Sequence, residues 1–493
     1  MSEGLSDLRR MLSSSGIYAV AGASQQALSF LLLPIYTRFI DPADYGILEL
    51  LTALSAVLFG VLAIGMPSAI VKCYHRDCET PDEQAALLAM GLSLAAPGLV
   101  VGALLLFVFA DDVSRVVLGL ETGGEFVRLV AANGVLASLA AVVLSTLRAQ
   151  ERALAFSVLS VTQVVVALSL NLVLVVYYDA GVRGIFWGNL SSNVVALPVG
   201  LLVARRSPRL VLVRRLAAPL IRFGLLLVPV VLATWTMNMS DRYVLRLFSD
   251  LSDVAVYGVG YKFGMIVEIM VVFPFQLAWP AISFSMSHRE GHRETYARAL
   301  TYLSAVLAYV LLVVSFSTRI ALPALVGEAY GDAYRVVPLV ALACCFNGIQ
   351  YCVSPGIIIA GKTRFLTLTI VAGAGLNLGL NFLLIPRWGM MGAAWATAGS
   401  FLLVAILIGA VAQRFYPVDY DYRRLAKIVG CALLVFLVGL QIPPDGSVGS
   451  VLWHVAFGVA AFPLALLFTG FLEDDERSTL RELWRHYVLR SAR

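Results

Sequence analysis

Long, continuously apolar runs recur about every 30–35 residues along this chain, and each can cross a hydrocarbon core about 30 Å thick as an α-helix. The runs do not alternate between apolar and polar residues, which excludes a membrane β-barrel. Hydrophobic residues make up 60% of the 493 residues, charged residues 14%, and the mean hydropathy is +0.86. A soluble globular protein of this length is therefore excluded. We predict an all-α, polytopic membrane protein.

The apolar pattern predicts about fourteen membrane helices. The predicted spans are 14–38, 44–70, 84–110, 126–148, 152–177, 183–204, 219–246, 254–283, 296–317, 334–360, 364–386, 389–413, 424–441 and 450–471. The first span is interpreted as retained, because its apolar run continues without a small-residue cleavage site. Lys and Arg are concentrated on one side of the predicted membrane, and the positive-inside rule then places both termini in the cytoplasm. The most basic loop, 205–215, is interpreted as a contact for anionic headgroups and not for nucleic acid.

The chain contains an internal repeat. The matching residues are Arg38 with Arg246, Tyr45 with Tyr257, Arg128 with Arg335, Arg152 with Arg364, Gly181 with Gly389, Gly184 with Gly392, and Trp187 with Trp395. Their separation is nearly constant, at about 210 residues, which is typical of a duplicated unit. We predict two pseudosymmetric six-helix lobes, 1–210 and 211–415, followed by two extra helices in 416–472 and an amphipathic cytoplasmic tail, 473–493. Paired bundles of this kind are typical of transporters.

A polar stripe follows one face of the predicted seventh span. Asn238, Arg242 and Arg246 are spaced four residues apart, and Asp241 lies at the edge of the stripe. Two like charges one helical turn apart repel each other. We therefore expect compensation either by a carboxylate from another helix or by an anionic ligand.

Other polar residues are predicted near this stripe. Lys262 should lie at a similar depth in the next span, and the first lobe repeats the scheme more weakly with Arg38 and Glu49. Gln25 and Gln26 would add uncharged hydrogen-bonding groups. Together these side chains predict a central cavity with cationic walls. The alternative is that the charged groups lie at the membrane interface or form internal ion pairs that hold helices together.

Glu268 lies deeper in the predicted membrane than the cationic residues and has no basic residue one helical turn away. Ionisable residues within membrane helices commonly mark ion or proton pathways. Glu268 is therefore a candidate for proton or ion coupling, with an ion pair to another helix as the alternative. Asp241 and Glu49 are further candidates for coupling.

Three sequence stretches carry a resemblance to a known family. They are LLLPIYTRFIDPADYGILEL at 31–50, SDRYVL followed by VYGVGYKFG at 240–264, and GMMGAAWATAGS at 389–400. In this order and spacing, the chain resembles the polysaccharide (O-antigen, Wzx-like) lipid-linked oligosaccharide flippases of the multidrug/oligosaccharidyl-lipid/polysaccharide exporter superfamily. The resemblance covers nearly the whole chain.

The resemblance implies an inner-membrane flippase that moves an undecaprenyl-pyrophosphate-linked glycan outward by alternating access. It maps the pyrophosphate-holding role onto Arg242 and Lys262, with Arg38 and Arg246 as further candidates. It also implies that the last two helices form a groove for the lipid tail. The expected partners are the lipid-linked glycan, membrane lipids, a coupling H+ or Na+, and a polysaccharide polymerase. We expect a monomer in a bacterial inner membrane, with no cofactor, metal or nucleic acid.

Two other functions remain open from the sequence. A multidrug or cation antiporter of the same fold would favour acidic cavity residues, whereas the set here is mainly basic. A membrane glycosyltransferase or ligase could use the DxD motif at Asp419 and Asp421, but the short connection leaves no room for a nucleotide-binding domain.

His288 and His292 have helical spacing for a metal, yet they lie in a charged loop and are interpreted as solvated. We therefore expect a transporter and not an enzyme.

Overall fold

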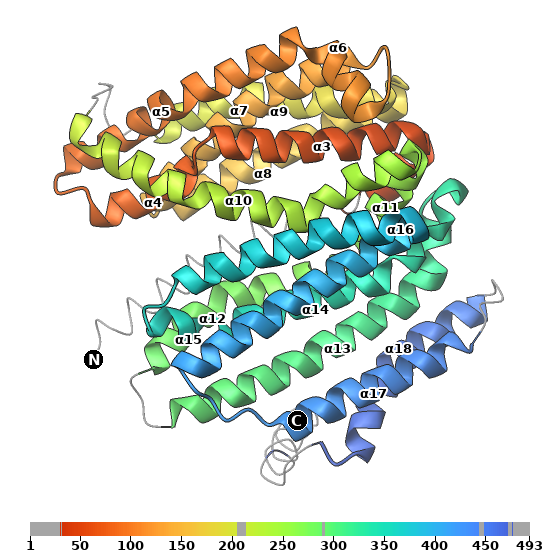
Figure 1. Ribbon diagram of the computed structural model, residues 1–493. Helices are drawn as coiled ribbons and strands as arrows, with labels where there is room; N and C mark the ends of the chain where they lie inside the picture. The colour runs from red at the N-terminus through yellow and green to blue at the C-terminus, as the bar shows by residue number, and fades with distance from the viewer. Residues whose placement is uncertain are drawn as a thin grey trace, which may run out of the picture.

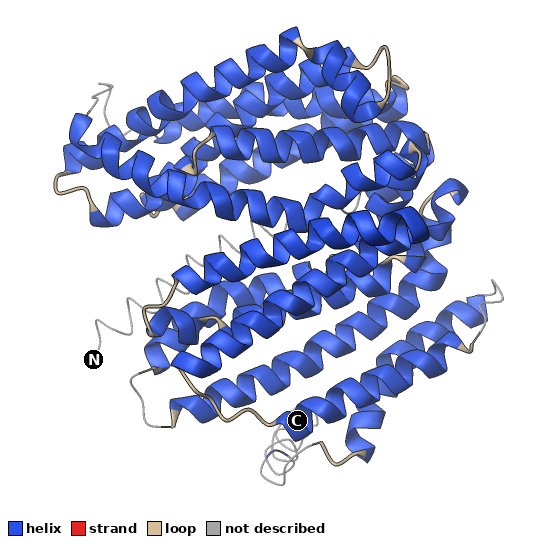
Figure 2. Cartoon of the chain, in the orientation of Figure 1, coloured by secondary structure: helices blue, strands red, loops and turns tan. Residues whose placement is uncertain are grey.

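A computed structural model of the chain describes residue 30, residues 32–204, 213–287, 291–442 and 448–471, and residue 476. Within these ranges every regular element is a helix and no strand occurs (Figure 2). The all-α prediction is therefore confirmed. The predicted tail, 473–493, lies outside the described residues except for Glu476, as do residues 205–212, where the two predicted lobes join.

The helices form three sets in chain order. The first set is α2 (Leu33–Phe39), α3 (Pro42–Leu62), α4 (Met66–Arg76), α5 (Pro81–Val108), α6 (Ala110–Val113), the π-helix η1 (Ser114–Leu118), α7 (Gly124–Ala149), α8 (Ala153–Leu172), the π-helix η2 (Val173–Tyr177) and α9 (Gly181–Ala204). The second set is α10 (Arg214–Phe248), α11 (Leu251–Gly264), the π-helix η3 (Glu268–Val272), α12 (Phe273–Met286), α13 (His292–Leu325), the 3₁₀-helix η4 (Glu328–Arg335), α14 (Val337–Val353), α15 (Pro355–Ile359) and α16 (Arg364–Phe415). The third set is α17 (Tyr422–Leu440) and α18 (Val448–Phe468).

The described residues contain ten helical segments long and apolar enough to cross a membrane. One of them, α16, has 52 residues and a non-helical backbone at Gly389, so it supplies two spans. The pair α17 and α18 adds two shorter apolar helices. The predicted first span, 14–38, lies mostly outside the described residues. These elements agree with the prediction of a multi-pass protein with about fourteen membrane helices.

The internal repeat has a counterpart in the backbone. Gly181 begins α9 with a φ of +53°, and its predicted match Gly389 bends α16 with a φ of +52°. A positive φ is the left-handed region that glycine adopts without steric cost. At each position the chain turns from one membrane helix into the next, so the two halves share this turn.

Figure 1 shows the first set of helices, α3 to α9, on one side of the molecule and α11 to α18 on the other, with α10 between them. Helix α10 packs against α3 and α4 of the first set and against α16 of the second. Apolar side chains of α3 to α9 form one core, which continues through α10 and α11 to parts of α13, η4, α14 and α16. A second core lies among α12 to α16 with the middle of α10, and a third lies between α13 and the pair α17 and α18. Helix α10 is thus the element that both groups share along their length.

Helices α3 and α11 meet at two repeat-related glycines. A Cβ atom at Gly46 would lie 2.1 Å from the Leu251 carbonyl oxygen, and a Cβ atom at Gly258 would lie 2.7 Å from Glu49 Cδ. Because neither distance leaves space for a side chain, the two glycines allow the helix backbones to approach closely. The contact is reciprocal, since each half contributes one glycine. It brings α3 of the first half beside the charged faces of α10 and α11.

Candidate functional site

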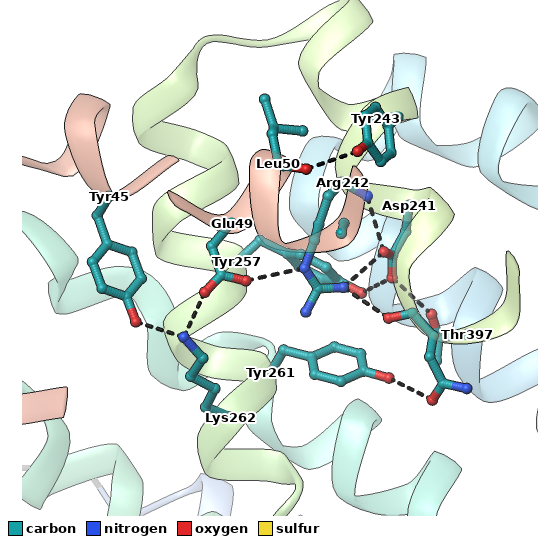
Figure 3. A network of polar contacts seen from close by, with 12 residues as sticks. Tyr45, Glu49, Leu50, Asp241, Arg242, Tyr243, Tyr257, Tyr261, Lys262 and Thr397 are labelled. Carbon is teal, nitrogen blue, oxygen red and sulfur yellow. Dashed lines mark hydrogen bonds and ion pairs between the residues drawn. The ribbon is translucent and has the colours of Figure 1, made fainter. Parts of the chain in front are cut away.

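Three helices bring four charged side chains together where α3 meets α10 and α11 (Figure 3). Glu49 comes from α3, Asp241 and Arg242 from α10, and Lys262 from α11. We call these four residues the charge network. With two acidic and two basic side chains, the charge network has no net charge when all four are ionised.

Glu49 joins the charge network across the two groups of helices. Its Oε2 accepts a hydrogen bond from Arg242 Nε at 3.1 Å, and its Oε1 accepts one from Lys262 Nζ at 2.5 Å. The Glu49 side chain is only 7% exposed. The sequence left open whether a carboxylate or an anionic ligand compensates the basic stripe. In this structure a carboxylate from another helix does so.

Asp241 holds the other side of the Arg242 guanidinium. Its Oδ1 lies 3.1 Å from Arg242 Nη1. Its Oδ2 accepts hydrogen bonds from the Tyr257 hydroxyl and, at 3.3 Å, from Thr397 Oγ1 on α16. Asp241 is completely buried, and these donors occupy both of its oxygens. The carboxylate therefore has the partners that a buried charge needs.

Arg242 and Lys262 differ in how accessible their side chains are to a ligand. The Arg242 side chain is 5% exposed and packs over the Tyr261 ring, with its guanidinium carbon 4.6 Å from the ring centroid. The Lys262 side chain is 39% exposed, although its Nζ also donates to the Tyr45 hydroxyl at 2.6 Å. In this conformation, Lys262 is the more accessible of the two cations.

Asn238 connects the charge network to a cavity of about 240 Å³. Its carbonyl oxygen accepts a hydrogen bond from Arg242 Nη1 at 2.8 Å, and its Oδ1 accepts one from the Tyr261 hydroxyl at 3.1 Å. Both Asn238 and Tyr261 line the cavity, which lies among α10, α11, η3, α14 and α16. Glu268 lines the same cavity from η3.

The remaining predicted residues lie elsewhere. Arg246 donates from Nε and Nη2 to the Leu118 carbonyl oxygen at 3.2 and 2.9 Å, at the end of η1. Arg38 donates to the Ala324 carbonyl oxygen at 3.3 Å and is exposed. Gln25 and Gln26 lie outside the described residues. The structure thus brings Asn238, Asp241, Arg242, Lys262 and Glu49 together and leaves Arg38 and Arg246 apart from them.

The residues of the DxD motif and the histidine pair that the structure describes make structural contacts. Asp421 accepts a hydrogen bond from the Arg424 backbone nitrogen at 2.9 Å and so caps the beginning of α17. His292 packs against the rings of Tyr296 and Tyr416, and His288 lies outside the described residues. In the part of the chain that the structure describes, no group of three or more His, Cys, Asp or Glu side chains could hold a metal ion.

Sequence reasoning did not assign a role to the aromatic residues and the threonine of this site. They are Tyr45, Tyr257, Tyr261 and Thr397. A signal did exist for two of them, because the Tyr-Gly pair at 45–46 recurs at 257–258 in the internal repeat. Tyr261 follows Tyr257 by one helical turn, so it shares the same helix face.

Several solved structures share this fold, among them a lipid II flippase and a multidrug resistance transporter. Lipid II flippase MurJ in an inward closed conformation aligns with a TM-score of 0.73 at 13% identity, over 92% of this chain and 98% of that chain. An inward-facing multidrug resistance MATE family transporter of the MOP superfamily aligns with a TM-score of 0.67 at 14% identity, over 82% of this chain and 96% of that chain. The chain therefore has the same fold as these two proteins.

Within that fold, the chain belongs to the family described as "Polysaccharide biosynthesis protein", which matches residues 11–287, more than half of its length. The predicted resemblance is thus confirmed. Among curated relatives, the "Uncharacterized membrane protein YabM" of Bacillus subtilis is 33% identical over 132 residues, 24% of this chain and 25% of that protein. The "Uncharacterized membrane protein MJ1068" of Methanocaldococcus jannaschii is 27% identical over 205 residues, 39% of each chain. These matches span well under half of either relative.

Proposed function

We propose that this protein is a flippase that moves an undecaprenyl-pyrophosphate-linked oligosaccharide from the cytoplasmic to the outer leaflet of a bacterial inner membrane by alternating access. The observation that carries the proposal is the charge network, which places two cations between two groups of helices. The membership in the polysaccharide biosynthesis family and the fold shared with a lipid II flippase support it.

The chemistry of the cargo matches this arrangement. A pyrophosphate and its sugars cannot cross hydrocarbon unaided, whereas an isoprenoid tail can remain in the lipid. The protein must therefore supply cationic groups for the head. Arg242 and Lys262 have the charge for that role, and in this structure Glu49 occupies them.

We propose that the pyrophosphate replaces Glu49 as the anionic partner during transport. Opening the side on which α3 meets α10 and α11 must separate Glu49 from Arg242 and Lys262. Removing one partner of a buried ion pair costs about 3–5 kcal/mol because the other charge remains uncompensated. An arriving pyrophosphate would offset that cost, so the loaded protein opens more readily than the empty one. This exchange would couple opening to cargo.

The membrane potential can drive the movement. Each elementary charge that crosses gains about 2.3 kcal/mol per 100 mV, so two negative charges that leave a negative interior gain roughly 4–5 kcal/mol. Transport is therefore favourable without a coupling cation, and a coupled H+ or Na+ would add to it.

The lipid tail needs a lateral path. Helices α17 and α18 pack against α13 through an apolar core that includes Phe316, Val435 and Phe462. We assign the tail to a groove beside this pair. In the proposed topology both termini are cytoplasmic, the protein acts as a monomer, and a polysaccharide polymerase uses its product.

A multidrug or cation antiporter is the second candidate, and two observations favour it. The fold is also that of a multidrug resistance MATE family transporter, and a carboxylate, Glu268, lines the cavity. Efflux of a cationic dye such as ethidium from cells that express the protein would support this candidate. Flipping of a lipid-linked glycan without dye efflux would support the flippase.

The decisive variant is Lys262→Gln, because Lys262 is the accessible cation. Loss of a charged hydrogen bond to phosphate costs about 1.5–3 kcal/mol, so we expect flipping in proteoliposomes to slow by about 10- to 150-fold. Lys427→Gln is the matched control, since Lys427 is a half-buried lysine apart from the charge network that donates to the Gly470 carbonyl oxygen. Comparable melting temperatures would verify folding. A wild-type flipping rate in Lys262→Gln would refute the assigned role.

A further inference from the structure

Two repeat-related arginines that the proposed path for the pyrophosphate does not use connect the two halves of the chain. Arg38 lies in the last turn of α2 in the first half, and Arg246 lies in the last turn of α10 in the second half. Arg38 donates a hydrogen bond to the carbonyl oxygen of Ala324, in the last turn of α13. Arg246 donates to the carbonyl oxygen of Leu118, the last residue of η1. Each arginine therefore contacts the end of a helix in the opposite half, where carbonyl groups have no partner within the helix.

The contact of Arg246 is the more extensive of the two. Its Nε and Nη2 both donate to the Leu118 carbonyl oxygen, at 3.2 and 2.9 Å, and its Nη1 donates to the Ser249 carbonyl oxygen at 3.1 Å. The planar guanidinium thus joins the end of α10 to the end of η1. Gly119 follows η1 with a φ of +68°, and a Cβ atom there would lie 2.4 Å from Arg246 Nη2. Position 119 therefore has no space for a side chain while the guanidinium lies in this place.

The contact of Arg38 is weaker but is supported by its neighbours. Arg38 is exposed, and its single hydrogen bond is 3.3 Å long. The Tyr330 hydroxyl of η4 donates to the Ile40 carbonyl oxygen at 3.0 Å. A Cβ atom at Gly327, between α13 and η4, would lie 2.7 Å from the Thr37 carbonyl oxygen. The segment that follows α13 therefore packs directly against the end of α2.

The internal repeat relates these two contacts to each other. Arg38 and Arg246 are 208 residues apart, and Gly119 and Gly327 are also 208 residues apart. Each half thus contributes one arginine at the end of a helix and one glycine in the connection that packs against the opposite half. The contact is reciprocal, which indicates that it belongs to the duplicated unit and not to one half alone.

The chemistry of these contacts differs from that of the charge network. Arg242 is paired with two carboxylates, whereas the partners of Arg38 and Arg246 among the described residues are neutral carbonyl groups. Arg246 also lies one helical turn beyond Arg242, nearer to the end of α10. The two arginine contacts are therefore separate from the charge network and lie closer to the molecular surface.

We propose that Arg38 and Arg246 form two reciprocal clasps, each made of one arginine and the carbonyl group that it contacts, which hold this end of the two halves closed. Both clasps must break before the halves separate here. The Arg246 clasp contributes more, because three hydrogen bonds hold it and one holds Arg38. This end faces outward in the proposed topology, and only that assignment rests on the proposed function.

The test measures the distance between two spin labels in the purified full chain, in nanodiscs without any glycan. The labels are placed at Ala43 in α3 and Asp253 in α11, two exposed positions in opposite halves. Hydrogen bonds from a charged donor are strong, so we expect Arg246→Gln to raise the ratio of open to closed protein by about 10- to 150-fold. Arg183→Gln is the matched control, since the partner of Arg183, Glu125, lies in the same half.

We expect Arg246→Gln to show a population at longer distance that the wild type and Arg183→Gln lack. Arg38→Gln removes one hydrogen bond and should show a smaller population of this kind, and the double variant should show the largest. Distances identical to the wild type in the double variant, or an equal increase in Arg183→Gln, would overturn the proposal.

A further variant covers a failure of Arg246→Gln to fold. Gly119→Ala retains Arg246 but places a methyl group against its guanidinium, so we expect the same population at longer distance. Wild-type distances in both Gly119→Ala and Arg38→Gln would again overturn the proposal. Because the assay contains no glycan, its result is independent of whether the protein moves a lipid-linked oligosaccharide.

Discussion

Replacing Glu49 by Gln tests whether the charge network holds the two groups of helices together. The substitution keeps the shape of the side chain and removes the carboxylate that contacts both Arg242 and Lys262. The network would then carry two positive charges and one negative charge. We expect the two groups of helices to separate more readily where α3 meets α11.

The structure indicates the size of this effect. Arg242 is buried, and loss of one partner of a buried ion pair costs about 3–5 kcal/mol. Arg242 keeps Asp241, so the lower value applies, and the partly exposed Lys262 contributes about 0–1 kcal/mol. A total of about 3–4 kcal/mol shifts the equilibrium between closed and open arrangements by about 150- to 900-fold.

The assay is a distance measurement between spin labels at Ala43 in α3 and Ala329 in η4, two exposed positions. These helices lie close together, since the rings of Tyr45 and Tyr330 have centroids 5.9 Å apart. The labelled Glu49→Gln protein should show a population at longer distance. Adding Lys262→Gln restores electrical neutrality and should reduce that population. A distance distribution identical to the wild type in Glu49→Gln would refute the reasoning.

Two other substitutions test the packing and the helix cap. Gly46→Val places a side chain against the Leu251 carbonyl oxygen. We expect this to destabilise the protein by about 1–3 kcal/mol and to lower its melting temperature. An unchanged melting temperature would show that α3 and α11 are not in close contact. Asp421→Ala removes the cap of α17 and should cost about 1 kcal/mol while flipping continues. Loss of flipping in a folded Asp421→Ala protein would contradict the structural role given to this aspartate.

The sequence predicted the membrane helices well because each is a long apolar run. Predicted spans such as 126–148 and 152–177 correspond to α7 and to α8 with η2. The repeat also identified Gly181 and Gly389 as equivalent, and both have a positive φ. The turn between the two membrane helices has the same positive-φ geometry in each half. Glycine therefore occurs at the equivalent position of both halves, where the sequence comparison can detect it.

The partners of the charged residues could be predicted only in part. Helical spacing showed that Arg242 needs an anionic partner, but Glu49 lies 193 positions away in the chain. Only the packing of α3 against α10 and α11 determines that pairing. The same limit applies to Glu268, whose partner Asn347 lies on another helix. Periodicity along the sequence shows which residues share the face of one helix, whereas this site is formed by side chains from several helices.

The burial of Arg242 between two carboxylates affects how the protein responds to its surroundings. Dissolved ions weaken exposed ion pairs but reach buried ones poorly. We therefore expect the contact between α3 and α10 to be almost equally stable at low and at high salt concentration. The two groups of helices could therefore stay closed on this side over a wide range of ionic strength without any change in the protein.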